Sequence, residues 1–249
     1  MQVLVARAAD RSTDLTRLLQ LENIDVLSVA FMQITAKKDM GGFEPSQSER
    51  FEFTISVSLH ASEIALSNPS ISRLVRESKS LFAVGAVSAQ PFVDMGLPVI
   101  TPNRSDSGQR SDENSDGLLS LSELRRANGK NVVILCGRGG RRELENVLSE
   151  RGARVTRCEL YQRSYRYEAA EDLRQVNSLP RALVAYSGYA ASCLARAIRE
   201  VIRVEWLSLP LVVPSLRVAW VARLEGFKNV SVSDGVAPER LVEQIQKHR

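Results

Sequence analysis

The sequence predicts an α/β protein made of two similar domains. Each domain would be a parallel sheet flanked by helices, and a two-segment linker would join the two domains. Two observations lead to this prediction. Short apolar runs alternate with helix-periodic segments along the chain, as in parallel sheets that are covered on both faces. The pattern also recurs after 129 or 130 residues, which indicates duplication of a whole domain.

The clearest strand-to-helix transition carries a glycine-rich turn. The apolar run Val132–Leu135 predicts a strand, and Gly137-Arg138-Gly139-Gly140 follows it. We expect this turn to place unshielded backbone N–H groups at a helix N-terminus, beside Arg138 and Arg141, where anions bind well. The turn therefore indicates a ligand with carboxylates or phosphates. A turn with no role beyond its tight geometry is the alternative.

A helix and a second strand complete this unit. Leu144, Val147 and Leu148 share one helix face, and Gly152 marks the end of that helix. Val155–Leu160 predicts the second strand, which ends at Tyr161. By its position alone, Tyr161 is more typical of an aromatic that packs at a hinge than of a catalytic group.

Matching positions in the two halves predict the order of the remaining elements. The matched pairs are Leu15/Leu144, Leu19/Leu148, Val26/Val155, Ser58/Ser187, Ala61/Ala190, Gly85/Ser215 and Gly96/Gly226. Each half reads strand, helix, strand, linker, strand–helix, strand–helix–strand and a final helix. The final helices are expected to begin near Asp116 and Pro238.

Two polar segments at equivalent places predict the linkers, 35–50 and 163–170. The chain would then cross between the domains twice. One domain would combine 1–34 with 171–249, and the other would be 51–162. A sequential split near residue 128 is the alternative, which periodicity alone leaves open. The polar stretch Asn103–Ser115 predicts a surface loop.

The composition excludes several classes of protein. A hydrophobic content of 44% and a charged content of 25% are typical of a soluble globular chain, and no apolar run is long enough for a membrane span. The start MQVLVARAAD lacks the pattern of a secretory signal. The net charge of +4 is spread along the chain, which disfavours nucleic acid as a partner. We expect a cytoplasmic protein without a membrane or nucleic-acid partner.

The cysteines and histidines predict neither a metal site nor a nucleophilic centre. Cys136, Cys158 and Cys193 lie in apolar strand or helix patterns, as buried free thiols of a reducing compartment do. Only His60 and His248 are present, and neither has an obvious acidic partner in the sequence. No spacing typical of zinc ligands or of a serine hydrolase occurs.

Four serines mark a shared edge of the predicted sheets. Ser58, Ser88, Ser187 and Ser215 each follow an apolar strand and precede a helix pattern. Each one by itself is a good helix N-cap. Together they lie at the carboxyl ends of parallel strands, where open α/β sheets bind ligands.

A dinucleotide site is a weaker interpretation of the glycine-rich turn. The dinucleotide fingerprint needs a third glycine, but Arg142 occupies that position. Glu159, near the end of the next strand, lies where an acid that binds ribose would be found. A nucleotide-dependent enzyme therefore stays an alternative.

Several segments together resemble uroporphyrinogen-III synthases of the bacterial type. They are VLVARAADRSTDLTRLL, CGRGGRRELENVLSERGARV, ELYQR, VAYSGYAAS and PSLRVAWVARLEGFKNV, which occur in the family's order over nearly the whole chain. The resemblance implies two α/β domains with the substrate between them, and favours the discontinuous domain. It also implies a monomer that uses no cofactor and no metal.

The resemblance further implies an activity. The substrate would be hydroxymethylbilane, a linear tetrapyrrole with eight carboxylates. Its ring would close with inversion of the last pyrrole, through an azafulvene and a spiro intermediate, to give uroporphyrinogen III. A binding module that holds an anionic small molecule without converting it is the alternative.

The resemblance assigns roles residue by residue. Tyr161 would be catalytic and would assist loss of the hydroxyl group. The substrate-binding positions would be Arg7, Ser58, Ser88, Gly137, Arg138, Gly139, Gly140, Ser187, Gly188, Ser215, Arg217 and Val218. The chain departs from the family pattern at Ala8, Val57, Ser62 and Cys136.

Overall fold

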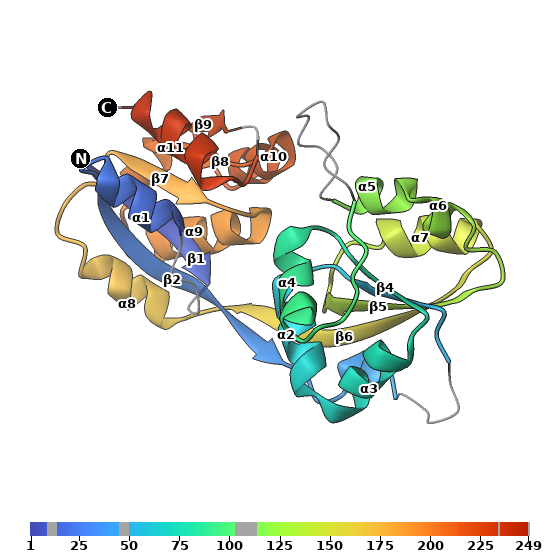
Figure 1. The fold of residues 1–249 in the computed structure, drawn as a ribbon. Helices are drawn as coiled ribbons and strands as arrows, with labels where there is room; N and C mark the ends of the chain where they lie inside the picture. Colours follow the sequence, from blue (N-terminus) through green and yellow to red (C-terminus); the bar gives the residue numbers. More distant parts are fainter. Residues whose placement is uncertain (9–13, 45–49, 103–113, 234, 249) are drawn as a thin grey trace. The chain divides into compact units, whose positions relative to one another are not determined.

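The computed structural model describes residues 1–8, 14–44, 50–102, 114–233 and 235–248. The chain divides into two compact units. The first unit joins Met1–Ile34 to Ser164–Arg249, and the second unit is Thr35–Arg163. Each unit is a parallel sheet with helices on both faces, which confirms the predicted fold class (Figure 1).

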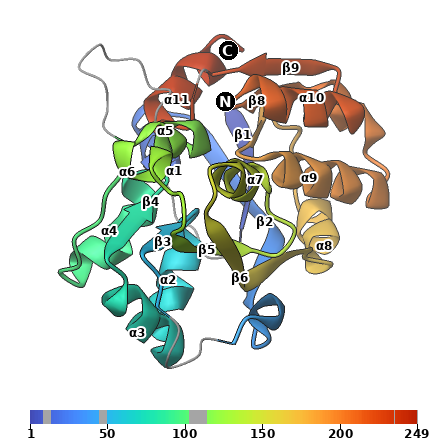
Figure 2. The same cartoon turned by 90° about the vertical axis from the view of Figure 1, so that its right-hand side faces the viewer.

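The sheet of the first unit has the strand order β2-β1-β7-β8-β9. Its strands are β1 (Gln2–Ala8), β2 (Asp25–Ala36), β7 (Ala182–Ala185), β8 (Pro210–Val213) and β9 (Asn229–Val232). Its helices are α1 (Asp14–Leu21), α8 (Glu168–Arg174), α9 (Gly188–Glu200), the 3₁₀ turn η2 (Val204–Ser208), α10 (Leu216–Leu224) and α11 (Pro238–Gln246). Figure 2 shows α8, α9 and α10 side by side along this unit.

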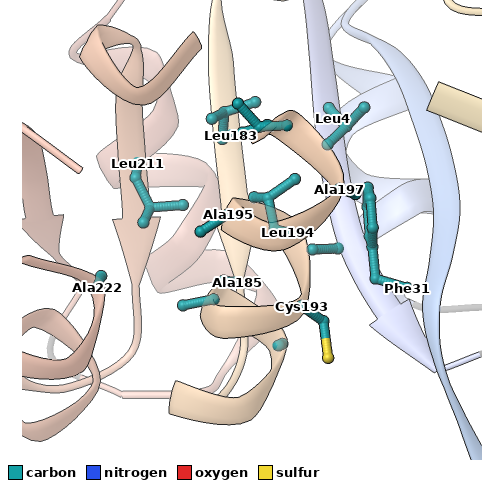
Figure 3. Packing of buried hydrophobic residues seen from close by; sticks show 14 of the residues in the cluster. Leu4, Phe31, Leu183, Ala185, Cys193, Leu194, Ala195, Ala197, Leu211 and Ala222 are labelled. Atoms are coloured by element: carbon teal, nitrogen blue, oxygen red, sulfur yellow. The ribbon is translucent and has the colours of Figure 1, made fainter. Parts of the chain in front are cut away.

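Alternation along the strands supplies both cores of the first unit, because successive side chains point to opposite faces. Leu4 and Leu183 pack with Leu194 of α9 on one face (Figure 3). Val3 and Val184 belong to the cluster on the other face, with residues of α1 and α11. Since both faces are covered, the central strands β7 and β8 are wholly apolar.

The second unit has the strand order β6-β5-β3-β4. Its strands are β3 (Phe53–Ser56), β4 (Ser80–Ala83), β5 (Asn131–Gly137) and β6 (Arg154–Tyr165). Its helices are η1 (Met40–Gly42), α2 (Leu59–Ser67), α3 (Pro69–Glu77), α4 (Ala86–Asp94), α5 (Ser115–Ser120), α6 (Ser122–Arg125) and α7 (Glu143–Glu150). Residues of α5, α6 and α7 share one core cluster with the sheet.

The strand registers reproduce the repeat found in the sequence. Val3 pairs with Ala182 in the first unit, and Val132 pairs with Phe53 in the second. Both pairs are related by the same shift of 129 positions. The equivalent of β9 is reduced to one bridge between Phe82 and Ile100. The units therefore share one strand order, with the strand–helix–strand segment first along the chain in one and last in the other.

The chain crosses between the units inside strands, at Ile34/Thr35 in β2 and at Arg163/Ser164 in β6. Polar composition predicted linkers at 35–50 and 163–170, and both of these segments begin inside strands. Strand β2 extends to Ala36, strand β6 continues to Tyr165, and helix α8 begins at Glu168. Polar residues do not prevent strand formation when neighbouring backbone groups are paired. Residues 45–49 of the first predicted linker and 103–113 of the predicted surface loop lie outside the described residues.

Candidate functional site

Tyr161 lies beside a β-bulge, and an equivalent bulge occurs in the other unit. In β5 and β6 the register shifts between Cys136 and Gly137, so that Gly137 pairs with Tyr161. The first unit has the same shift after Arg7, where Ala8 pairs with Met32. The bulge is therefore a property of the duplicated fold, whereas the tyrosine belongs to the second unit alone.

The hydroxyl of Tyr161 has two side-chain partners. It lies 3.0 Å from the Ser58 Oγ atom, and it accepts a hydrogen bond of 3.0 Å from Arg163. The tyrosine is 1% exposed, and its ring is packed edge-on against His60, with centroids 5.8 Å apart. Serine and arginine therefore hold a buried phenol in one orientation.

The glycine-rich turn offers fewer free N–H groups than we expected. The Arg138 N–H donates to the Tyr161 carbonyl at 2.7 Å, and the Gly140 N–H donates to the Gly137 carbonyl at 3.1 Å. The turn is also separated from the helix, which begins only at Glu143. The expectation of unshielded amides at a helix N-terminus is therefore wrong for Arg138 and Gly140. The Arg138 N–H is bonded across the bulge and the Gly140 N–H within the turn, where Gly139 adopts a φ of +69°.

The arginines around the turn have different roles. Arg138 is exposed and forms no ion pair among the described residues. Arg157 is 12% exposed and lies beneath the turn, where its guanidinium donates to the carbonyls of Gly140 and Arg141 at 3.4 and 3.2 Å. Arg138 is thus available to an anion, whereas Arg157 supports the turn.

The dinucleotide interpretation finds no support in this geometry. The Glu159 carboxylate lies 3.8 Å from Arg157. Its side chain also fills the space above Gly41, where an added Cβ atom would lie 3.0 Å from the Glu159 Cγ atom. The acid proposed to bind ribose is thus engaged with groups of its own unit.

Three of the four predicted serines have related positions. Ser58, Ser187 and Ser215 are N-caps of α2, α9 and α10, and each side chain accepts a hydrogen bond from the backbone N–H three residues on. Ser88 does not occupy such a turn. It lies inside α4 and is 7% exposed, and Gly85 is the N-cap of that helix.

The remaining predicted residues lie in the first unit. Gly188 begins α9, where an added Cβ would lie 3.1 Å from Val221. Arg217 is exposed in the first turn of α10. Val218 is 1% exposed, and its N–H donates to Ser215 at 3.4 Å, so it is a core residue rather than a free donor. Arg7 lies at the carboxyl end of β1, directly before the bulge.

Sequence reasoning missed two neighbours of Tyr161. Arg163 is two residues further along β6, so its side chain lies on the same face of the strand as Tyr161, a spacing that could have indicated their contact. His60 does have an acidic neighbour, because its Nδ1 atom lies 3.5 Å from the Glu63 carboxylate. Spacing of i to i+3 on a helix is a signal that could have revealed this pair.

The cysteines are buried free thiols, as expected. Burial raises the pKa of Cys136 and of Cys193 to about 11, and that of Cys158 to about 12. Among the residues that the structure describes, no three His, Cys, Asp or Glu side chains form a group that could hold a metal ion. Every helix in the described ranges is too short or too polar to cross a bilayer.

Comparison with known proteins identifies the relatives of this chain. Residues 13–243 match the family model described as uroporphyrinogen-III synthase HemD. The uroporphyrinogen-III synthase of Escherichia coli (strain K12) is 36% identical over 137 residues, covering 54% of this chain and 56% of that protein. The enzyme of Proteus mirabilis is 47% identical over 53 residues, covering 21% and 27%. The matches thus span at most about half the length of these curated relatives.

Solved structures show the same fold at low identity. Uroporphyrinogen-III synthetase from Helicobacter pylori 26695 has a TM-score of 0.65 at 13% identity, covering 100% of this chain and 99% of that one. A mutant uroporphyrinogen III synthase from the extremely thermophilic bacterium Thermus thermophilus has a TM-score of 0.59 at 15% identity, covering 100% and 98%. At these identities the likeness extends to the fold alone.

Proposed function

The chain belongs to the uroporphyrinogen-III synthase family, and we propose that it converts hydroxymethylbilane into uroporphyrinogen III with loss of one water. The observation that carries the proposal is the Tyr161 hydroxyl, held by Ser58 and Arg163 beside the bulge. A phenol is a suitable donor to a departing hydroxyl group.

The two partners of the phenol have different roles in the proposed reaction. Ser58 is anchored by the N–H of Ala61, whereas Arg163 is exposed and can be displaced with little loss of packing. Substrate therefore reaches the hydroxyl by replacing Arg163, which is then free to bind a carboxylate. With Ser58 donating to the phenolic oxygen, the phenol proton points to the departing hydroxyl.

The phenol gives up one proton in the proposed reaction and regains one at its end. The hydroxyl leaves with the phenol proton as water, and an electron-deficient azafulvene is left behind. The substituted carbon of the last pyrrole attacks it, and the spiro intermediate fragments and recloses. The proton released on reclosure restores the phenol. Binding must favour the folded substrate that leads to inversion, because the unassisted reaction gives the unrearranged isomer.

Each unit contributes donors for the carboxylates. In the second unit the exposed side chains of Arg138 and Arg163 would bind carboxylates, and in the first unit Arg217 would do so. The first unit also supplies the turns at Ser187 and Ser215, together with Arg7 at its strand end. We leave out Ser88 and Val218, because one lies inside a helix and the other is a core residue.

We further propose a cyclising hydro-lyase that acts as a cytoplasmic monomer without cofactor or metal, on a small molecule rather than a nucleic acid. Three buried free thiols suit a reducing compartment. The two compact units serve as its domains, and the chain passes from one to the other at Ile34/Thr35 in β2 and at Arg163/Ser164 in β6.

The test is to supply purified protein with hydroxymethylbilane and to resolve the product isomers. We expect isomer III to form in excess of the spontaneous isomer I. A product consisting of isomer I alone, at the rate seen without protein, would refute the proposal and leave a binder of anionic small molecules.

A further inference from the structure

A chain of buried serine hydroxyls lies next to the Tyr161–Ser58 pair. Ser56 ends β3 and Ser62 lies in α2, and both are 0% exposed. Their Oγ atoms are 2.8 Å apart, and the Ser62 hydroxyl lies 2.6 Å from the carbonyl of Ser88 in α4. The hydroxyls therefore connect a strand end with two helices.

The donors and acceptors of this chain can be assigned. Each hydroxyl has one proton to donate. The short distance assigns the Ser62 proton to the Ser88 carbonyl, so Ser56 donates to the Ser62 oxygen. Both hydroxyls also lie close to the Ser58 carbonyl, at 3.3 and 3.2 Å. Buried hydroxyls cost stability unless they are bonded in this way.

The duplicated unit shows that the fold does not need these hydroxyls. A shift of 129 positions takes Ser56 to Ala185 and Ser62 to Ala191, and both alanines are 0% exposed. The N-cap serine is retained, since Ser58 corresponds to Ser187. The tyrosine is not retained, because Met32 lies at the position equivalent to Tyr161. In this chain, the two buried hydroxyls therefore belong to the unit that has the tyrosine.

We propose that Ser56 and Ser62 are positioning residues, which fix the first turn of α2 so that the Ser58 Oγ atom holds the Tyr161 hydroxyl in its reactive orientation. The inference rests on the proposed function of Tyr161. Ser58 lies between the two serines in the chain, and its carbonyl also accepts the N–H of Ser62 at 3.1 Å. Anchoring this segment on both sides leaves Ser58 little freedom.

The test compares Ser62→Ala and Ser56→Ala with the control Ser67→Ala, whose exposed hydroxyl caps Ile64 at the end of the same helix. The alanines of the first unit show that the backbone accepts the buried substitutions. We expect Ser62→Ala to lower kcat about three- to tenfold, which is the range that one hydrogen bond supplies, with KM unchanged. Ser67→Ala should have wild-type kcat.

Two further readouts separate positioning from general stability. In a Tyr161→Phe background, Ser62→Ala should cause no additional fall in kcat, because the hydroxyl that it positions is gone. Hydrogen exchange at the Ala61 N–H, which donates to Ser58, should speed up in Ser62→Ala but not in Ser67→Ala. The exchange readout does not require turnover, so it decides the positioning even if the protein proves to lack synthase activity.

Wild-type kcat in both buried variants, or a fall in kcat that adds fully to that of Tyr161→Phe, would overturn the inference. Unchanged exchange at Ala61 in folded Ser62→Ala protein would overturn it as well.

Discussion

The ring of Tyr161 occupies the space that a side chain on residue 137 would need. A Cβ atom added to Gly137 would lie 2.6 Å from the Cε2 and Cζ atoms of the tyrosine. Real Cβ atoms essentially never approach other atoms so closely. The glycine and the tyrosine are therefore one structural pair, placed face to face by the bulge between β5 and β6.

Gly137→Ala should destabilise the second unit and displace the phenol. Overpacking of a well-packed site costs about 1–3 kcal/mol of unfolding free energy, measurable by urea denaturation. The double variant Gly137→Ala/Tyr161→Met removes the ring that lies against this added Cβ atom, so its stability should recover. Turnover should stay low in both variants. A single variant with wild-type stability would contradict the steric pairing.

The repeat allowed much of the fold to be predicted from the sequence. Its spacing also contained information that we did not use. Gly85 matches Ser215, which is a helix N-cap, and the structure shows Gly85 to be an N-cap too. This match could have identified Gly85, rather than Ser88, as the residue at the turn.

Other features of the site depend on tertiary contacts that periodicity does not report. The bulge moves the pairing of Gly137 along β6 by one residue. The Arg138 N–H then donates to the Tyr161 carbonyl and is not free to bind a ligand. A one-residue change of register changes every neighbour along a strand. The pairing of Tyr161 with Ser58, 103 positions away in the chain, follows from the sheet order and not from local sequence.

Ser58→Ala and Ser187→Ala form a matched pair, because both serines cap a helix in the same way. Each variant should lose about 1 kcal/mol of unfolding free energy, the usual cost of removing such a cap. Only Ser58 contacts the tyrosine, so only Ser58→Ala should lower kcat. Equal kcat in the two variants would show that the Ser58–Tyr161 contact has no role in turnover.

The buried thiols should make stability fall in alkali. Unfolded cysteine ionises near a pKa of about 8.5, but burial raises the pKa of Cys158 to about 12. Between these values the unfolded chain binds fewer protons than the folded one, so the unfolding free energy decreases as pH rises. The expected slope is about 1 kcal/mol per pH unit for each thiol above pH of about 9. Urea denaturation at several pH values should show a smaller slope for Cys158→Ala.

The same burial should protect the thiols from alkylation near neutral pH, because the thiolate is the reactive form. Cys136, Cys158 and Cys193 are all below 5% exposed. We expect iodoacetamide to modify none of them appreciably in the folded protein and all three in urea. Rapid labelling of one cysteine in the folded state would contradict its burial.

Tyr161→Phe should remove the proton donor that we propose, while leaving the proposed substrate-binding groups in place. Phenylalanine retains the ring that fills the space above Gly137, so folding should be preserved. General-acid help is typically about 10²- to 10⁴-fold, and a single hydrogen bond gives less, so we expect kcat to fall by about 10²-fold. Affinity for the product should be nearly unchanged, as measured by equilibrium binding. Arg163→Gln should act differently, raising KM more than it lowers kcat, because we propose that this arginine leaves the phenol when substrate enters and then binds a carboxylate. If Tyr161→Phe turned over at the wild-type rate, the tyrosine would have no part in the chemistry. Selection of the folded substrate would then account for the whole of the catalysis.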